Sequence, residues 1–298
     1  MQHFGDELGS RSLRRDAVID EVQHEDKIGC APLLKWPGGK RALVGNFQDH
    51  IPTAFQTYYE PFFGGGALFF ALEPSRAVIG DLNEELVNCY QVVQSDPKGL
   101  VSILKTFRND EENYYRIRDY RPRTNLRRAA RLLYLTRLSF NGIHRVNLRG
   151  DFNVPYGRKT HLESFDKEAI HRASIALSGV EILAGDFESL TIRASSGDLV
   201  YFDPPYTVAH ANNGFVKYNE RIFSWSDQVR LAAHAEELAN RGCTVIVSNA
   251  DHESVRQLYR SAHVETIERY SVISASKDHR RLITECLFVL SGEKRLAR

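Results

Sequence analysis

The sequence has few cysteines, and they are not arranged to stabilise a small secreted fold. Four cysteines occur in 298 residues, all widely separated and without a C-x-x-C pair. The eleven histidines also lack the spacing that is typical of zinc ligands. We therefore expect reduced thiols and no metal.

Long apolar runs are absent as well. No stretch of eighteen or more apolar residues occurs, and the first residues include Asp6 and Glu7 where a signal peptide would place a basic start and an apolar stretch. These absences predict a cytoplasmic protein without membrane contact. Neither an internal repeat nor a low-complexity tract occurs, and 42% hydrophobic residues are enough for a globular core.

Two common nucleotide-binding motifs are incomplete. A dinucleotide fingerprint that starts at Gly64 would need glycine at position 69, where Phe69 stands. A phosphate-binding loop around residues 38–40 would need an earlier glycine at the position of Leu34, and Ser or Thr at that of Arg41. A nicotinamide dehydrogenase and a P-loop nucleotidase are therefore disfavoured.

Charge is plentiful but unevenly placed. The formal net charge of the chain is +1, yet residues 116–159 contain twelve lysines and arginines against two acids, a local charge of +10, so the remainder carries −9. A basic block on a near-neutral protein is typical of a polyanion-binding lobe joined to a catalytic lobe. The alternative is a solvated, arginine-rich helix face.

Short apolar runs alternate with helical patterns along the chain. We expect strands at 57–60, 77–80, 180–183, 199–202, 244–247 and 284–290, and helices at 67–72, 83–93, 126–138 and 228–240. This alternation predicts an α/β fold with a mainly parallel sheet covered by helices. Residues 139–159 are aperiodic and contain glycine and asparagine, which indicates a loop or hairpin that presents side chains.

The spacing of the segments predicts two lobes. About 135 residues separate the glycine-rich turn after the first strand from Asp203, more than two strand–helix crossovers require. We therefore assign residues 31–95 and 166–298 to the catalytic domain and 96–165 to an inserted domain, which contains the basic block. Residues 1–30 are expected to be a flexible extension.

The turn Asp203-Pro204-Pro205-Tyr206 directly follows an apolar strand, and ligands bind at such strand ends in open α/β sheets. Two prolines stiffen the turn and remove two N–H donors, so its carbonyls and carboxylate can only accept hydrogen bonds. An exocyclic amino group whose hydrogens are accepted by Asp203 and the Pro204 carbonyl would regain a nucleophilic lone pair. Tyr206 would then stack on a base taken out of the duplex. The alternative is a proline-stiffened strand exit.

The segment Glu60–Gly66 (EPFFGGG) also follows a strand, and its glycines allow close approach of a ligand to the backbone. Asp81 ends the next strand, where a carboxylate can meet the ribose hydroxyls of an adenosine ligand. Asp81 could instead be the N-cap of the helix that starts near Asn83. Residues 207–223 are interpreted as a loop that orders around the flipped base, or as a plain surface excursion.

Taken in order, residues 34–40 (LKWPGGK), 60–66 (EPFFGGG) and 203–206 (DPPY) resemble the motifs of Dam-type, alpha-group DNA adenine-N6 methyltransferases. Residues 137–158 (RLSFNGIHRVNLRGDFNVPYGR) are similar to the target-recognition hairpin of that family. The resemblance runs from about residue 34 to residue 290 and implies a Rossmann-like sheet with an inserted, helical, basic DNA-recognition domain. It also implies S-adenosylmethionine as the cofactor and double-stranded DNA as the partner.

The resemblance also implies roles for individual residues. Those implied in catalysis are Asp203, Pro204, Pro205 and Tyr206. Those implied in cofactor binding are Trp36, Lys40, Glu60, Phe62, Gly64, Gly66, Asp81, Asp186, Phe187 and Asp203. Those implied in DNA binding are Lys35, Phe140, Asn141, Ile143, Arg145, Arg149 and Arg158. The implied target is GATC, read by a nucleoid-associated enzyme of prokaryotic or phage type that is monomeric or forms a DNA-dependent dimer.

Two other functions fit parts of the pattern. Enzymes that methylate RNA or a protein glutamine share an acid- or amide-Pro-Pro-aromatic turn, but Asp at position 203 and the basic insertion favour a DNA base. A catalytically silent DNA-binding protein would not need Asp203, Tyr206 and Asp81 intact. Methylation of adenine in DNA is therefore the predicted activity.

Overall fold

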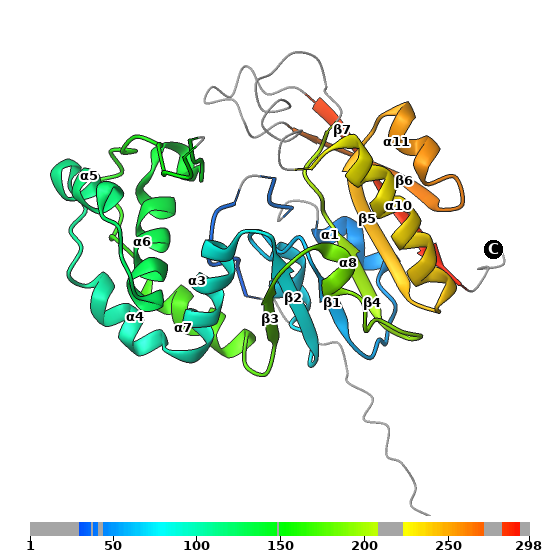
Figure 1. The fold of residues 1–298 in the computed structure, drawn as a ribbon, viewed down its shortest axis with the longest axis horizontal. Coiled ribbons are helices and arrows are strands. Elements are labelled where there is room, and N and C mark those ends of the chain that lie inside the picture. Colours follow the sequence, from blue (N-terminus) through cyan, green and yellow to red (C-terminus); the bar gives the residue numbers. More distant parts are fainter. Residues whose placement is uncertain are drawn as a thin grey trace, which may run out of the picture.

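The computed structural model describes residues 30–36, 38–40, 44–147, 149–207, 223–270 and 282–292. The extension expected at residues 1–30 lies outside them except for residue 30, and so does the loop expected at 207–223 except for its two ends. Figure 1 shows a sheet with helices on both faces, and a group of helices beyond one end of that sheet. No helix in the described ranges is long and apolar enough to span a membrane.

The sheet has seven strands among the described residues, in the order β3-β2-β1-β4-β5-β7-β6. All neighbouring pairs are parallel except those made by β7, which is antiparallel to β5 and β6. The strands are β1 (Tyr58–Glu60), β2 (Ala77–Asp81), β3 (Glu181–Ala184), β4 (Leu199–Phe202), β5 (Thr244–Ala250), β6 (His263–Tyr270) and β7 (Leu282–Ser291). The expected mainly parallel, Rossmann-like sheet is confirmed.

Both faces of the sheet are buried, which explains why the central strand β4 has no charged residue and is buried along its whole length. Along β4, Leu199 and Tyr201 belong to one hydrophobic cluster, whereas Val200 and Phe202 belong to a second cluster on the other face. The first face packs against α1 (Val44–Phe47), α2 (Ala67–Leu72) and α3 (Glu84–Ser95). The second packs against α8 (Phe187–Leu190), α10 (Trp225–Asn240) and α11 (Glu253–Leu258) (Figure 1).

The group of helices beyond β3, here called the helical lobe, comprises α4 (Pro97–Leu104), α5 (Glu111–Asp119), α6 (Asn125–Leu138), η3 (Phe140–Gly142) and α7 (Lys167–Ala176). The sequence patterns predicted α6 but not α4, α5 or α7. The signal for these short helices is their N-caps, because Asp96, Asp110 and Asp166 each accept a hydrogen bond from a backbone N–H of the first turn. Of the loop or hairpin expected at residues 139–159, antiparallel bridges from Val146 to Phe152 and from Ser139 to Tyr156 favour the hairpin.

The sequence patterns also missed β6 and placed the start of α10 too late. Strand β6 lies at the edge of the sheet and mixes charged and apolar residues, so it carries no continuous apolar signal. Helix α10 begins three residues before the expected start because Ser224 and Asp227 form a capping box. The box orients the helix that supports the turn after β4.

Candidate active site

Four adjacent parallel strands deliver the predicted residues to one edge of the sheet. Strands β3, β2, β1 and β4 lie in that spatial order. Residues 186–187 follow β3, residue 81 ends β2, residues 60–66 begin at the end of β1, and residues 203–206 follow β4. Because the carboxyl ends of parallel strands share an edge, segments far apart in the chain become neighbours. Chain order reverses between β1 and β4, which is where open α/β sheets bind ligands.

Asp203 lies immediately beyond β4 and is paired with Lys40 from the N-terminal LKWPGGK motif. The Lys40 Nζ atom lies 2.9 Å from Asp203 Oδ1, and it also donates to the carbonyl of Gly38 over 3.2 Å. Lys40 is only 5% exposed, whereas Asp203 is 18% exposed. The carboxylate is thus held from the protein side while part of it remains accessible to a substrate.

Two further side chains surround the Lys40 ammonium. Glu285 Oε2 on β7 lies 3.8 Å from Nζ, and Nζ lies 4.6 Å from the centroid of the Tyr206 ring. Burial alone would lower the pKa of this ammonium, but the negative charges around it, Asp203 first, outweigh burial and raise that pKa. Lys40 is therefore a permanent cation inside the site, placed between two carboxylates.

The turn after β4 is fixed by a chain of buried amides. Gln228 on α10 donates to the Pro205 carbonyl over 3.3 Å, and Asn249 at the end of β5 donates to Gln228 over 2.9 Å. Tyr206 shares a hydrogen bond of 3.3 Å with Ser248. Among the hydrogen bonds of the described residues none involves the carbonyl of Pro204, which is a buried residue.

The glycine turn between β1 and α2 is shaped by close contacts. Gly64 and Gly66 have φ of 48° and 65°, in the left-handed region that favours glycine. A Cβ at Gly66 would lie 2.7 Å from Phe63 Cε2, and one at Gly64 would lie 2.9 Å from Trp36 Cδ1. The turn can take no larger residue, and Trp36 packs directly against it.

Asp81 is held under the same turn. Its carboxylate accepts from the backbone N–H of Gly64 over 3.1 Å and from that of Asn83 over 2.9 Å. Burial raises the pKa of Asp81, and these backbone hydrogen bonds partly oppose the rise. The alternative in which Asp81 caps α3 is wrong, because the Asn83 side chain is the N-cap and accepts from the N–H groups of Glu85 and Leu86.

Glu60 is the last residue of β1, and its side chain is buried, with 2% exposed. Tyr58 donates its hydroxyl to Glu60 Oε2 over 2.8 Å. Burial raises the pKa of Glu60 to about 8, although the hydrogen bond from Tyr58 opposes part of the rise. At neutral pH this carboxyl is largely protonated, so it can both donate and accept.

Asp186 and Phe187 follow β3 and, together with Phe62, form one wall of the candidate site. Phe187 stacks with Phe62 at a centroid separation of 5.6 Å, and Arg230 of α10 lies 4.4 Å above the Phe187 ring. Arg230 also donates to both oxygens of Asp186, over 2.9 and 2.8 Å. These hydrogen bonds are the main reason that the pKa of Asp186 is lowered. This wall thus contains an aromatic pair, the half-buried Phe62 and the buried Phe187, next to a carboxylate in a fixed orientation.

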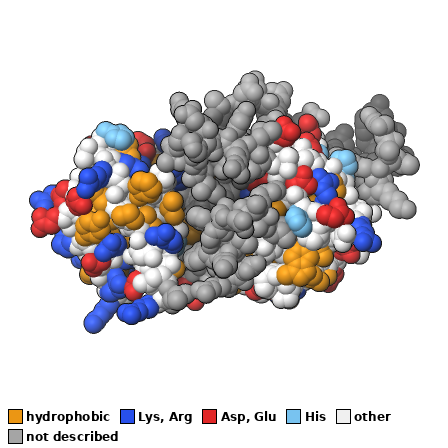
Figure 2. Space-filling model, turned by 90° about the horizontal axis from the view of Figure 1, so that it is seen from above, with side chains coloured by type: hydrophobic (Ala, Val, Ile, Leu, Met, Phe, Trp, Pro, Cys, Tyr) orange, Lys and Arg blue, Asp and Glu red, His pale blue; other side chains and the backbone are white. Residues whose placement is uncertain are grey.

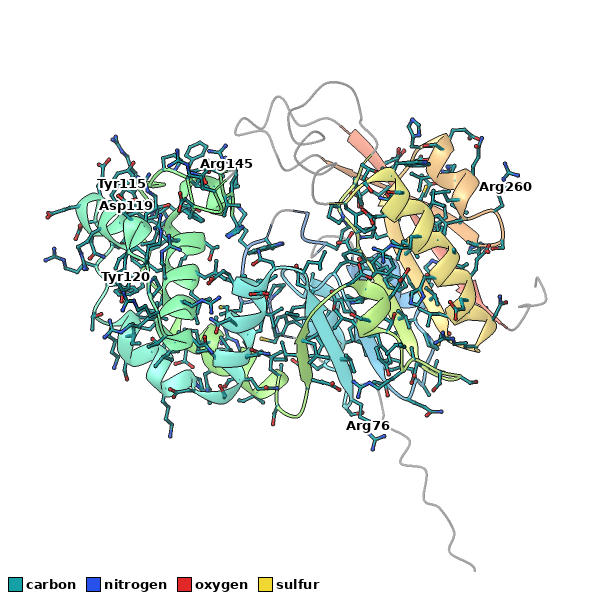
Figure 3. The ribbon with its side chains drawn as sticks, viewed as in Figure 1. Arg76, Tyr115, Asp119, Tyr120, Arg145 and Arg260 are labelled. Atoms are coloured by element: carbon teal, nitrogen blue, oxygen red, sulfur yellow. The ribbon has the colours of Figure 1, made fainter. Side chains whose placement is uncertain are left out.

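The predicted DNA-binding residues lie in the helical lobe, except for Lys35. Arg145 is exposed, donates from Nε to Asn153 over 2.9 Å, and lies at the upper end of the lobe (Figure 3). Asn141 has φ of 54°, a conformation that asparagine adopts more readily than most residues. Arg149 and Arg158 are exposed as well. Apart from Lys35, the exposed residues of this set therefore lie within the hairpin segment, residues 137–158.

Several arginines of the basic block have partners within the protein. Arg121 pairs with Asp151 over 2.6 Å, and Arg128 pairs with Glu85 over 2.7 Å. Arg131 donates to backbone carbonyls at the end of α5. The lobe still displays many lysine and arginine side chains on the face shown in Figure 2. Part of the block is therefore already paired within the protein.

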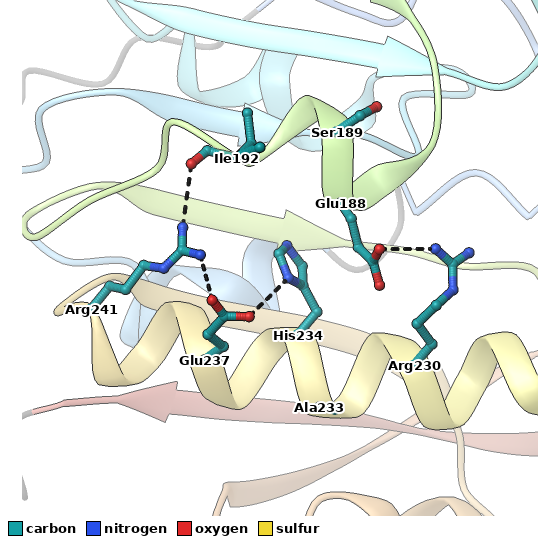
Figure 4. Close-up of a pocket in the computed structure, with 8 residues that line it drawn as sticks. All are labelled: Glu188, Ser189, Ile192, Arg230, Ala233, His234, Glu237 and Arg241. Carbon is teal, nitrogen blue, oxygen red and sulfur yellow. Dashed lines mark hydrogen bonds and ion pairs between the residues drawn. The ribbon is translucent and has the colours of Figure 1, made fainter.

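A separate pocket lies between α8 and α10 (Figure 4). Its lining residues are Glu188, Ser189, Ile192, Arg230, Ala233, His234, Glu237 and Arg241. Its charged side chains satisfy one another, for example Arg230 with Glu188 over 3.2 Å and Arg241 with Glu237. It contains none of the predicted catalytic residues, so we place the active site at the strand ends.

The structure adds site residues that the motifs did not reveal. Glu285, Gln228 and Arg230 come from strands and helices late in the chain, and no local pattern marks them. His144 lies inside the predicted hairpin, and the motifs imply no role for it. Its ring stacks on Trp36. Among the described residues no group of three or more His, Cys, Asp or Glu side chains could hold a metal ion.

Comparison with known proteins bears directly on this site. Residues 36–273 match the family model of the D12 class N6 adenine-specific DNA methyltransferases. The type II methyltransferase M1.LlaDCHI of Lactococcus lactis subsp. cremoris is 38% identical over 278 residues, which cover 90% of this chain and 98% of that protein. The DNA adenine methylase of Escherichia coli K12 is 32% identical over 260 residues, covering 85% and 93%. The type II methyltransferase M.MjaIII of Methanocaldococcus jannaschii is 34% identical over 274 residues.

Proposed function

This chain belongs to the D12 class of N6 adenine-specific DNA methyltransferases, and we propose that it transfers a methyl group from S-adenosylmethionine to the N6 atom of a flipped adenine in double-stranded DNA. The observation that carries this proposal is the position of Asp203. It lies at the reversal of chain order, partly exposed, held by Lys40 and next to the glycine turn.

The residues of the turn prepare the amino group. Asp203 and the Pro204 carbonyl each accept one N–H of the adenine amino group, which drives the nitrogen toward a tetrahedral geometry with an available lone pair. The Pro205 carbonyl is already occupied by Gln228, so the turn offers its acceptors in a fixed direction. Tyr206 provides a ring for stacking, with the Lys40 ammonium nearby. A flipped base is required because an amino group within the duplex cannot reach this turn.

The glycine turn and its neighbours fit the cofactor. The turn presents backbone where no Cβ can be accommodated, Asp81 offers a carboxylate to ribose hydroxyls, and the wall of Phe62, Phe187 and Asp186 suits an adenine ring and its amino group. Trp36, Lys40, Glu60, Gly64 and Gly66 complete the proposed set. The cofactor supplies an electrophilic methyl on a sulfonium centre.

Residues 96–165, which form the helical lobe apart from α7, are the proposed recognition domain, and GATC is the proposed target. The supporting observation is the exposure of Asn141 and Arg145 on a hairpin that is internally bonded. An arginine that donates two hydrogen bonds to one guanine is the commonest specific contact in the major groove. The remaining proposed contacts are Lys35, Phe140, Ile143, Arg149 and Arg158.

Direct sequencing of modified adenines tests this proposal. A plasmid from cells that lack other adenine methylation is sequenced after expression of the wild-type chain and of Asp203→Ala. We expect N6-methyladenine at a single motif with the wild type and none with the variant. Methylation of RNA alone, or modification of adenine by the variant at wild-type levels, would overturn the proposal.

A further inference from the structure

Residues 35 and 36 lie between the glycine turn and the hairpin. Trp36 contacts the turn, since a Cβ at Gly64 would lie 2.9 Å from Trp36 Cδ1. Its indole stacks on His144 of the hairpin, with ring centroids 4.6 Å apart and 20° between the planes. One side chain thus touches both the proposed cofactor turn and the proposed recognition hairpin.

His144 continues this contact into the hairpin. Its ring meets Phe152 at 5.6 Å in an edge-on arrangement, and Phe152 pairs with Val146 across the hairpin. A Cβ at Gly142 would lie 2.8 Å from Lys35 Cδ, which is a second close approach of the same two segments. Arg145 directly follows His144, so the position of the stack fixes the backbone from which Arg145 extends.

The histidine is suited to stacking as an uncharged ring. Burial, followed by the positive charge of Arg131, lowers the pKa of His144 to about 4. The imidazole is therefore neutral at physiological pH and behaves as an aromatic partner of the indole. His144 therefore contributes apolar packing between the segment that contains Trp36 and the hairpin.

We propose that His144 is a specificity-determining positioning residue: through its stack on Trp36 it holds the recognition hairpin in register with the glycine turn. Cofactor bound at that turn and cognate DNA bound at the hairpin then stabilise the same arrangement of Trp36 and His144, so each tightens the binding of the other. The inference rests on the proposed function, because it assigns this stack to the coupling of the two proposed ligands.

The test compares His144→Ala with His144→Phe, which keeps an aromatic ring. For each protein, kcat/KM is measured on duplexes that carry the mapped target and on duplexes with one flanking base changed, and DNA affinity is measured with and without S-adenosylmethionine. An aromatic stack corresponds to about threefold to tenfold in an equilibrium. We expect His144→Ala to reduce both the discrimination ratio and the cofactor-dependent gain in DNA affinity by about that factor, and His144→Phe to retain them.

Phe107→Leu is the matched control, because Phe107 is a buried aromatic of the same lobe that packs edge-on against Tyr134. It should lower the melting temperature while leaving both ratios unchanged. Unchanged ratios in His144→Ala, or an equal fall in Phe107→Leu, would overturn the inference. Absence of DNA methylation by the wild type would instead refute the proposed function, so the two failures are distinguishable.

Discussion

Lys40 lies between Asp203 and Glu285, and the three side chains form one buried charged group at the end of β4. A buried charge is tolerated when it is paired, whereas removing one partner leaves an uncompensated charge in a medium of low polarity. The ammonium therefore has two tasks. It orients the Asp203 carboxylate, the proposed acceptor for the substrate amino group, and it permits Glu285 to be buried nearby.

Lys40→Met should destabilise the protein by about 3–5 kcal/mol, because two carboxylates then lose their shared cation. The double variant Lys40→Met/Glu285→Gln should recover part of this loss, since it removes one of them. Urea unfolding of the three proteins measures the effect. A double variant that is less stable than Lys40→Met would contradict this arrangement of charges.

Glu60 makes stability depend on pH. Its pKa in the folded protein is about 8 against an ordinary value of 4.5, so the folded state holds this proton more tightly. The corresponding stability is fully present below pH 4.5 and is lost as the pH rises through 8. The free energy of unfolding of the wild type should thus fall relative to Glu60→Gln between about pH 5 and 8, as urea titrations at several pH values would show. A difference that stays constant with pH would rule out this role for Glu60.

At the scale of elements, the turns that follow the strands carry the proposed catalytic and cofactor-binding residues, and their shapes are fixed by tight contacts. Gly66→Ala should destabilise the protein by more than the cost of a left-handed alanine, about 1–2 kcal/mol, because the new Cβ also meets the Phe63 ring. It should also weaken cofactor binding measured by calorimetry. Gly45→Ala is the control, since a Cβ there would meet nothing within 4 Å. Equal effects of the two substitutions would contradict the argument.

Gln228 connects α10 to the turn after β4, so it should affect catalysis without touching substrate. Gln228→Leu should lower kcat by about tenfold, the value of one lost hydrogen bond in a buried network, while cofactor affinity stays unchanged. Gln257→Leu on α11 is the matched control because that amide bonds only an exposed neighbour, Glu253. Loss of cofactor binding in Gln228→Leu, or an equal effect of the control, would show that Gln228 has a different role.

Much of this arrangement follows from local sequence. The strands that carry the glycine turn and Asp203 are short apolar runs ending in turn residues, and they lie where their patterns predict. The partners of those turns could not be predicted, because they depend on strand order. Strand β7 inserts between β5 and β6, and this alone places Glu285 opposite Ala250 at the end of β5. Arg230 and His144 likewise depend on how a helix and a hairpin dock.

At the scale of the whole molecule, the basic residues of the helical lobe divide into those that bond within the lobe and those on its surface. Arg149 and Arg158 lie on the surface and are exposed, and Arg158 also has a long ion pair of 3.8 Å with Glu111. Each phosphate contact steepens the slope of log affinity against log salt concentration by about one unit. Arg149→Gln/Arg158→Gln should therefore make that slope shallower by about two units in DNA-binding titrations.

Arg76→Gln/Arg260→Gln removes the same charge from two exposed positions remote from the hairpin, one below the sheet and one at the opposite side of the molecule (Figure 3). This control should leave the salt slope unchanged. Equal slopes for both double variants would mean that only net charge matters and that the lobe is not the DNA-binding surface.

The central claim is that the turn at residues 203–206 grips an adenine amino group and directs its nitrogen at the methyl donor. Single-turnover transfer of labelled methyl from S-adenosylmethionine to duplex DNA tests it most directly, with calorimetric cofactor binding measured on the same preparations. Asp203→Ala should lose transfer by at least about a hundredfold, as expected for a lost transition-state contact, while binding cofactor with nearly wild-type affinity. Transfer by Asp203→Ala at the wild-type rate would contradict the claim.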